Sequence, residues 1–257
     1  MSSIVKFAAL SVAATLAAAC AVCHAQAWPS KPIRMLVGFP PGGPTDVIAR
    51  LVSEKVAAQV GGRFVIDNRP GAAGNIAVEI LAKANPDGHT LLYSSNAIAL
   101  SPGLYPKLPY DPFKDVAPVT EIGSGCLIFL VHPSLPTTTV QEFIDYAKAR
   151  PGQLNYASSG TGTSTHLAAV LFSQRTGITT QHIPYKGTAP SLIDMIAGRT
   201  QFLMGAVNTA VPHVRDGKLR ALAVTGAKRI QSLPELRTLE ESGLPGLVVT
   251  SWQGLFA

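Results

Sequence analysis

A loop rich in glycine and proline at residues 38–46 is the segment of this chain best suited to bind an anion. It reads Gly-Phe-Pro-Pro-Gly-Gly-Pro-Thr-Asp and lies between an apolar run at 33–37 and a run with helical periodicity at 46–60. Glycine allows the backbone to turn tightly and approach a ligand, and proline stiffens the loop. Because the first N–H groups of a helix lack partners within it, we expect a carboxylate to bind here, with Thr45 as the N-cap.

Two later segments repeat the order of strand, polar loop and helix. The loops at 158–165 and 186–189 are rich in Ser, Thr and Gly, and each precedes an expected helix. In open α/β sheets, ligands bind beyond the carboxyl ends of the strands. If the two halves of the chain face each other, the three loops meet at one cleft, where Lys186 adds a charge-assisted bond. Any one of these loops alone favours a purely structural connection, whereas three in one chain favour binding.

Two charged residues beside these loops have alternative interpretations. Asp46 repels an anion unless it caps its own helix or accepts a hydrogen bond from ligand or water, and capping is the simpler interpretation. Lys186, taken alone, fits an ordinary solvated lysine. Tyr185 and His166 fit packing or capping better than ligand binding.

Several catalytic and metal-binding motifs are absent from the sequence. The glycine spacing in the 38–46 loop matches a P-loop, but Pro and Thr stand where Lys and Ser/Thr are required, so nucleotide hydrolysis is not expected. There is no G-x-S-x-G or H-E-x-x-H motif, and the histidines lack ligand spacing. We therefore expect a non-enzymatic protein without cofactor or metal. The alternative from another class is an exported hydrolase that uses Ser158, Ser159 or Ser164 with His166.

The N-terminal residues are typical of an export signal. Residues 1–27 contain Lys6 as their only charge, an apolar run at 7–19 and a small-x-small sequence ending at Ala27. The apolar run is short for a membrane span. We expect cleavage near Ala27 and an extracytoplasmic mature protein, with a lipoprotein signal at Cys20 as the weaker alternative.

The composition indicates a globular, mildly basic protein. Hydrophobic residues make up 47% of the 257 residues and charged residues 14%, with a formal net charge of +6. The basic residues are scattered, so a nucleic-acid surface is not expected. Once the signal is removed Cys126 is the single cysteine, and its apolar surroundings in the sequence predict a core position without a disulfide.

The alternation of apolar runs and helical periodicity predicts an α/β fold with parallel strands and right-handed crossovers. A proline-rich segment at 94–118 is expected to be irregular, and a buried strand is expected at 127–132. The alternation of expected strands and helices then begins again, which predicts two α/β units.

The two units define the expected domains. We expect domain 1 to comprise 28–125 plus 226–257, and domain 2 to comprise 126–225. No capping element follows the last apolar strand-like residues, so the C-terminal part is expected to be truncated at Ala257.

Motifs spread over the whole mature chain carry a family resemblance. They are Trp-Pro-Ser-Lys-Pro-Ile-Arg at 28–34, the 38–46 loop, Asp-Asn-Arg-Pro-Gly-Ala-Ala-Gly-Asn at 67–75, Pro-Asp-Gly-His-Thr-Leu-Leu at 86–92, Leu-Tyr-Pro-Lys-Leu-Pro-Tyr-Asp-Pro at 104–112, Tyr-Lys-Gly-Thr-Ala-Pro-Ser-Leu at 185–192, Gly-Lys-Leu-Arg-Ala-Leu-Ala-Val-Thr at 217–225 and Ser-Trp-Gln-Gly-Leu-Phe-Ala at 251–257. With these motifs the chain resembles the Bug-type receptors, the periplasmic solute-binding components of tripartite tricarboxylate transporters.

The resemblance implies a two-domain, type II-like periplasmic-binding-protein fold with a hinge between the domains. Such a protein closes as a monomer on a di- or tricarboxylate, an acidic amino acid or an aromatic acid, and delivers it to a membrane permease. A ligand-sensing subunit of a two-component system is the alternative. Val170, Gln201 and Gly205 stand where acidic residues are usual in the family, which is expected to affect ligand choice.

The resemblance and the three loops together predict the ligand-binding residues. They are Phe39, Pro41, Gly42, Gly43, Thr45, Asp46, Ser94, Asn96, Ser158, Gly160, Thr161, Gly162, Thr163, Thr165, Lys186, Gly187, Thr188, Ala189 and Gly205.

Overall fold

The computed structural model describes residues 28–257. The predicted export signal at 1–27 and its cleavage near Ala27 lie outside the described residues. Within 28–257, no helix combines the length and the apolar character needed to cross a bilayer.

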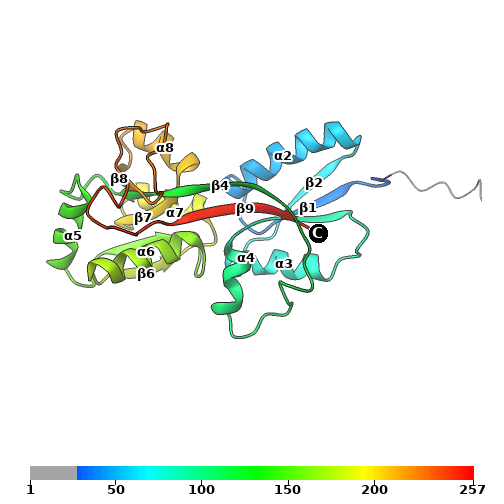
Figure 1. The fold of residues 1–257 in the computed structure, drawn as a ribbon, viewed down its shortest axis with the longest axis horizontal. Helices are drawn as coiled ribbons and strands as arrows, with labels where there is room; N and C mark the ends of the chain where they lie inside the picture. The colour runs from blue at the N-terminus through cyan, green and yellow to red at the C-terminus, as the bar shows by residue number, and fades with distance from the viewer. Residues whose placement is uncertain (1–27) are drawn as a thin grey trace, which may run out of the picture.

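Two α/β halves are connected by two long strands (Figure 1). The first half contains β1 (Ile33–Val37), α2 (Pro44–Val60), β2 (Phe64–Asn68), the 3-10 turn η1 (Ala72–Gly74), α3 (Asn75–Ala82), β3 (Thr90–Ser95), α4 (Ala97–Leu100) and the 3-10 turn η2 (Ser101–Gly103). The second half contains α5 (Val140–Lys148), β5 (Asn155–Ser158), α6 (Ser164–Thr176), β6 (Gln181–Pro184), α7 (Thr188–Ile196), β7 (Phe202–Ala206), α8 (Val207–Arg215) and β8 (Arg220–Val224). The connecting strands are β4 (Pro118–Val131) and β9 (Thr250–Phe256).

One sheet extends through both halves in the order β2-β1-β3-β9-β4-β7-β5-β6, with β8 also paired to β4. Strand β1 pairs parallel with β2 and β3, and β5 pairs parallel with β6 and β7, which confirms the predicted α/β class. Strand β9 runs antiparallel to β3 and β4, and β4 runs antiparallel to β7 and β8. Every one of these antiparallel pairs contains β4 or β9, the strands that connect the halves.

Strand β4 changes its partner near the middle. It pairs with β9 as far as Cys126, opposite Thr250, and from Leu127 onward it pairs with β7 and β8. The strand begins well before the predicted run at 127–132. The prediction missed its first residues because they are polar, glycine-rich and mostly exposed. The predicted start of domain 2 at residue 126 coincides with this change of partner.

The segment 226–249 packs differently from the prediction that placed it in domain 1. Leu239 and Leu247 belong to a core cluster with residues of the second half, and Leu233 belongs to another such cluster. The chain therefore re-enters the first half at β9 rather than at residue 226. We assign 226–249 to domain 2, because these leucines pack in its core. The segment has no helical or strand periodicity that would have indicated this packing.

Each half has an apolar cluster on either face of the sheet. In the first half, α2 covers one face, where Met35 and Tyr93 pack with Ala49. Helix α3 covers the other face, where Leu36 packs with Val78. Two clusters cover the faces of the sheet in the second half in the same way. These cores fix the strand ends that face the gap between the halves.

Candidate binding site

A cavity of about 330 Å³ lies where the two halves meet. Its walls contain residues from both halves and from both connecting strands, within the segments 39–48, 93–95, 122–127, 159–165, 188, 206–208 and 251–253. Of the described residues that line it, none has a charged side chain. A ligand in this cavity would therefore be held by hydroxyl, amide and backbone groups.

The loop at 38–46 brings the start of α2 to the cavity. Gly43 is the N-cap, Pro44 occupies the first helical position, and no side chain caps the helix. The expected N-cap role of Thr45 is therefore wrong, because proline at the first helical position moves the cap back to Gly43. Thr45 instead lies in the first turn, buried, with its side chain on the cavity wall. This uncapped N-terminus favours a negatively charged group.

Asp46 holds the binding loop in place instead of lining the cavity. Its carboxylate accepts hydrogen bonds from Gly42 N (3.0 Å), Arg50 Nε (2.9 Å) and Asn68 Nδ2 (2.9 Å). Asn68 also donates to the carbonyl of Phe39 at 2.9 Å. Burial alone would raise the pKa of Asp46, but the hydrogen bonds from Arg50, Gly42 and Asn68 together lower it. Asp46 is thus an ionised tether between the loop, α2 and the end of β2.

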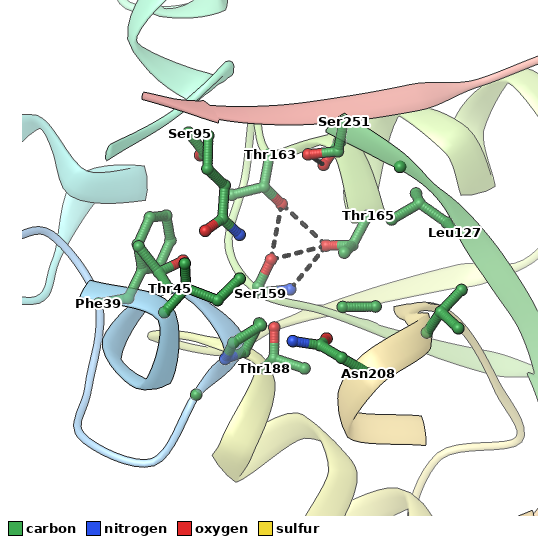
Figure 2. A pocket seen from close by; sticks show the side chains of 18 of the residues that line it. Phe39, Thr45, Ser95, Leu127, Ser159, Thr163, Thr165, Thr188, Asn208 and Ser251 are labelled. Atoms are coloured by element: carbon green, nitrogen blue, oxygen red, sulfur yellow. Dashed lines mark hydrogen bonds between the residues drawn. The ribbon is translucent and has the colours of Figure 1, made fainter. Parts of the chain in front are cut away.

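Three hydroxyl groups form a compact network at the start of α6 (Figure 2). Ser159 Oγ lies 2.8 Å from Thr165 Oγ1 and 3.2 Å from Thr163 Oγ1, and the two threonine oxygens are 2.9 Å apart. Thr163 Oγ1 also donates to the carbonyl of Gly160 at 2.7 Å. All three side chains are buried and line the cavity. Because hydroxyl hydrogens rotate, the network can turn a donor toward an anion.

The start of α8 places an amide donor opposite the hydroxyl network. Asn208 Oδ1 accepts a hydrogen bond from Thr209 N at 3.0 Å, which leaves Nδ2 to donate toward the cavity. Thr188, the first residue of α7, lies beside it (Figure 2). The second half therefore provides donors from the starts of three helices.

Strand β9 links the two halves at the cavity. Ser164 Oγ donates to Ser251 Oγ at 3.1 Å, and Ser251 Oγ donates to Asn96 Oδ1 at 3.2 Å. Asn96 acts through this chain and does not line the cavity itself. The three residues belong to the second half, the connecting strand and the first half.

The halves also touch at the rim, so the structure represents a closed arrangement. A Cβ atom at Gly187 would lie 2.5 Å from Cδ of Pro40, so the first and third predicted loops are in contact. Tyr105 Oη donates to the carbonyl of Thr161 at 3.2 Å, which joins the proline-rich segment to the second predicted loop. The three loops expected to converge do meet.

The predicted site residues divide into two groups. Those that line the cavity are Phe39, Gly43, Thr45, Thr163, Thr165 and Thr188. Those placed off its wall are Pro41, Gly42, Asp46, Ser94, Asn96, Ser158, Gly160, Thr161, Gly162, Lys186, Gly187, Ala189 and Gly205. Many of the residues off the wall belong to the loops whose backbone positions the lining residues.

Strand alternation explains part of this division. Tyr93 and Ser95 line the cavity and Ser94 does not, since successive strand side chains point to opposite faces. The neighbour of Gly205, Ala206, lines the cavity in the same way. Sequence reasoning also missed Asn208, Ser251, Gln253 and the middle of β4. The Ser-Trp-Gln-Gly motif at 251–254 was the available signal for two of these.

The geometry does not favour the alternative of a serine hydrolase. Ser158 is fully buried off the cavity, and its Oγ lies 2.6 Å from His182 Nε2. His166 Nδ1 accepts from Gly162 N at 3.2 Å, and its ring stacks on that of His182 with centroids 4.2 Å apart. Burial and the neighbouring His166 lower the pKa of His182 to about 4. Within 28–257, no carboxylate contacts His182, and no cluster of His, Cys, Asp and Glu forms a metal site.

The fold and the cavity between its halves define the periplasmic-binding-protein class. The profile of the TctC family, described as tripartite tricarboxylate transporter family receptor, matches residues 48–257, and the chain belongs to this family. A UPF0065 protein in the tcbD-tcbE intergenic region of Pseudomonas sp. strain P51 is 38% identical over 90% of this chain and 69% of its own length. Protein BugT of Bordetella pertussis is 37% identical over 91% of this chain and 72% of its own length. The resemblance to Bug-type receptors is thereby confirmed.

Solved structures agree with this fold. R. palustris Rpa4515 with adipate has a TM-score of 0.87 at 38% identity, covering 90% of this chain and 77% of its own. MatC from Rhodopseudomonas palustris with bound malate has a TM-score of 0.83 at 33% identity, covering 90% and 79%. The periplasmic binding protein BugD has a TM-score of 0.86 at 31% identity, covering 90% and 77%. The family consists of periplasmic solute-binding receptors, which are not enzymes.

Proposed function

We propose that the protein is an exported receptor that captures a small organic carboxylate between its two halves and delivers it to the membrane components of a tripartite tricarboxylate transporter. The observation that carries this proposal is the cavity itself. It combines an uncapped helix N-terminus from the first half with hydroxyl and amide donors from the second. Two relatives of the same fold whose structures contain adipate and malate support a carboxylate ligand.

The cavity can hold an anion without a basic side chain. One helix N-terminus contributes about 0.3–1 kcal/mol toward an exposed anion and more when partly buried. The starts of α2, α6 and α7 each place a threonine on the wall, at Thr45, Thr165 and Thr188. Lys186, which lies off the wall, is not needed for this mode of binding. Release then depends on opening the cavity rather than on breaking a salt bridge.

Closure makes capture reversible and specific. Residues from both halves line the cavity, and the rim contacts at Gly187 and Tyr105 form only when the halves approach. A ligand that contacts both walls therefore stabilises the closed arrangement. Strands β4 and β9, which cross between the halves, are the elements about which we propose the halves move.

A thermal-shift measurement tests the binding function. The protein purified from the periplasm of an expression host is heated with succinate, malate, adipate, citrate, aspartate or benzoate. The proposal predicts that at least one of these carboxylates raises the melting temperature in a concentration-dependent way. If none does, and calorimetry also detects no heat, the receptor proposal is wrong.

A matched pair of substitutions locates the binding. Thr188→Val removes a cavity hydroxyl, whereas Thr200→Val removes a buried hydroxyl that lies off the cavity wall. We expect Thr188→Val to weaken carboxylate binding and Thr200→Val to leave it unchanged. Equal effects of the two substitutions would place the ligand elsewhere.

The transporter partnership needs a separate measurement. Family membership supports a permease as the partner. We expect the monomeric, ligand-bound receptor to crosslink to the membrane components of a tripartite transporter in the producing cells. Crosslinking to a sensor kinase instead would favour the sensing alternative.

A further inference from the structure

Two buried polar atoms at the cavity have no hydrogen-bond partner within residues 28–257. They are Oη of Tyr93 and Oε1 of Gln253. Both residues line the cavity, and the side chain of Tyr93 is 0% exposed. Buried polar groups are rarely left unpaired, because such a group loses its hydrogen bonds to water without replacement. Two of them at one cavity point to a ligand group that pairs with both.

The strand register brings the two side chains to the same face of the sheet. Ser95 lies directly opposite Gln253 in the antiparallel pair of β3 and β9. Directly opposed side chains share a face, and Tyr93 shares the face of Ser95 because it is two residues away. This is the face that α2 covers, where Ile48 and Ile122 also line the cavity. Tyr93 and Gln253 thus lie on one face of the sheet, together with Ser95 and beside these apolar side chains.

The position of the Tyr93 ring is fixed by the core of the first half. The ring packs in the apolar cluster that contains Met35, Val37 and Ala49. A side chain held in this way cannot turn to find another partner. The hydroxyl is therefore held in one position, buried at the wall of the cavity that Tyr93 lines, where a ligand group that reaches it finds a preorganised hydrogen-bond site.

The two atoms require a ligand group that both accepts and donates a hydrogen bond. Burial raises the pKa of Tyr93 to about 12, so its hydroxyl is protonated at neutral pH and donates. Gln253 Oε1 accepts. A ligand hydroxyl can accept from the first and donate to the second. An ionised carboxylate has no hydrogen for Gln253 Oε1 and pairs with this residue only if the amide turns to present Nε2, and an alkyl group pairs with neither.

We propose that Tyr93 and Gln253 are specificity-determining residues that select a hydroxylated carboxylate. The ligand's carboxylate is held by the helix starts, and its hydroxyl pairs with Tyr93 Oη and Gln253 Oε1. This inference rests on the proposed carboxylate-binding function. It narrows that function from small carboxylates in general to those that carry a hydroxyl group.

Matched ligand pairs that differ by one hydroxyl test the proposal. The purified exported protein is titrated calorimetrically with malate and succinate, with gamma-hydroxybutyrate and butyrate, and with para-hydroxybenzoate and benzoate. We expect the hydroxylated member of the best-fitting pair to bind about tenfold more tightly or better, the difference that one or two buried hydrogen bonds provide.

Substitutions at the pair then assign the preference. Tyr93→Phe removes the donor and Gln253→Met removes the acceptor at similar side-chain volume. Each is expected to reduce the affinity for the hydroxylated ligand to near that of its parent, while the affinity for the parent stays within about twofold. Tyr110→Phe is the matched control, because Tyr110 Oη donates to Asn75 Oδ1 at 2.8 Å away from the cavity. It should leave the preference intact.

The outcomes separate this inference from the proposed function. If carboxylates bind without a preference for the hydroxylated member, or if the preference survives both Tyr93→Phe and Gln253→Met, the inference is wrong and the receptor function stands. If no carboxylate binds, both are wrong. Because Tyr93→Phe removes an unpartnered group, the variant should melt no lower than the unliganded wild type, which checks that it folds.

Discussion

Substitution of Asp46 by alanine tests whether this residue is the tether of the binding loop. The change removes three hydrogen bonds that connect the loop to α2 and β2. A bond to a charged group contributes about 1.5–3 kcal/mol when it is buried. The bond from Arg50 contributes less, at most about 1 kcal/mol, because that side chain is 52% exposed. Asn68 keeps its bond to Phe39, which limits the loss further.

We therefore expect Asp46→Ala to lower the free energy of unfolding by about 2–3 kcal/mol. Urea unfolding followed by circular dichroism measures this, and an unchanged m-value confirms that the unfolding transition is comparable. Arg50→Ala is the control and should cost at most about 1 kcal/mol. We also expect weaker carboxylate binding in Asp46→Ala, since a loose loop must be ordered when the ligand binds.

The pH dependence gives this prediction a second readout. The folded-state pKa of Asp46 lies below its ordinary value of 3.8. The stabilisation is therefore fully present above about pH 3.8 and is lost as the pH falls through the lower folded-state pKa. The difference between wild type and Asp46→Ala should shrink in that range. A loss below about 0.5 kcal/mol, or a difference that does not change down to pH 2, would refute the tether role.

Two further predictions concern closure and pH. Gly187→Ala should weaken ligand binding, because its Cβ would lie 2.5 Å from Cδ of Pro40 in the closed arrangement, and it should also lower stability, because Gly187 has a φ of +159°. Gly103→Ala, with open space around it, should bind normally in calorimetry. Equal affinities for the two variants would contradict the rim contact. His182→Gln should flatten the pH dependence of stability between about pH 6.5 and pH 4. Because the pKa of His182 is depressed in the folded protein, the unfolded chain binds the proton first as the pH falls. The free energy of unfolding of the wild type therefore falls by up to about 1.4 kcal/mol per pH unit in this range. Unfolding curves at several pH values measure this slope, and an unchanged slope would show that the histidine does not control it.

The loop and helix pattern of the sequence could predict much of the first wall of the site. Glycine and proline between an apolar run and a helical run placed the start of α2 within two residues of Pro44. The cap itself was missed, because the choice between Gly43 and Thr45 depends on how proline fits the first turn. Asp46 in α2 was recognised as ambiguous. Its partner Asn68 lies at the end of β2, 22 residues further along the chain, so local sequence could not reveal the tether.

The parts that failed depend on long-range pairing. Ser94 was chosen where Tyr93 and Ser95 line the cavity, because an apolar strand buried on both faces gives no local indication of which face meets the ligand. The antiparallel pairing of β4 with β9 joins residues far apart in the chain. The segment 226–249 has no periodicity, so only its contacts in the folded protein show that it belongs to the second half.

The same limit applies to the third predicted loop. The helix start after β6 was predicted, and Thr188 is indeed on the cavity wall. Lys186 was chosen for its charge, but the contact between Gly187 and Pro40 directs this part of the loop toward the rim. Its role is to meet the opposite loop.

Protection of Cys126 by a bound carboxylate tests the central claim most directly. Cys126 is a free cysteine that lines the cavity where β4 changes its partner. Burial raises the pKa of its thiol, so alkylation is slow at neutral pH and can be followed in time by mass spectrometry. If the ligand occupies this cavity, a saturating carboxylate should slow alkylation of Cys126 in the wild type. In Thr188→Val, the same concentration of carboxylate should no longer slow the reaction. A carboxylate that binds by calorimetry yet leaves the alkylation rate unchanged would contradict the claim that this cavity is the binding site.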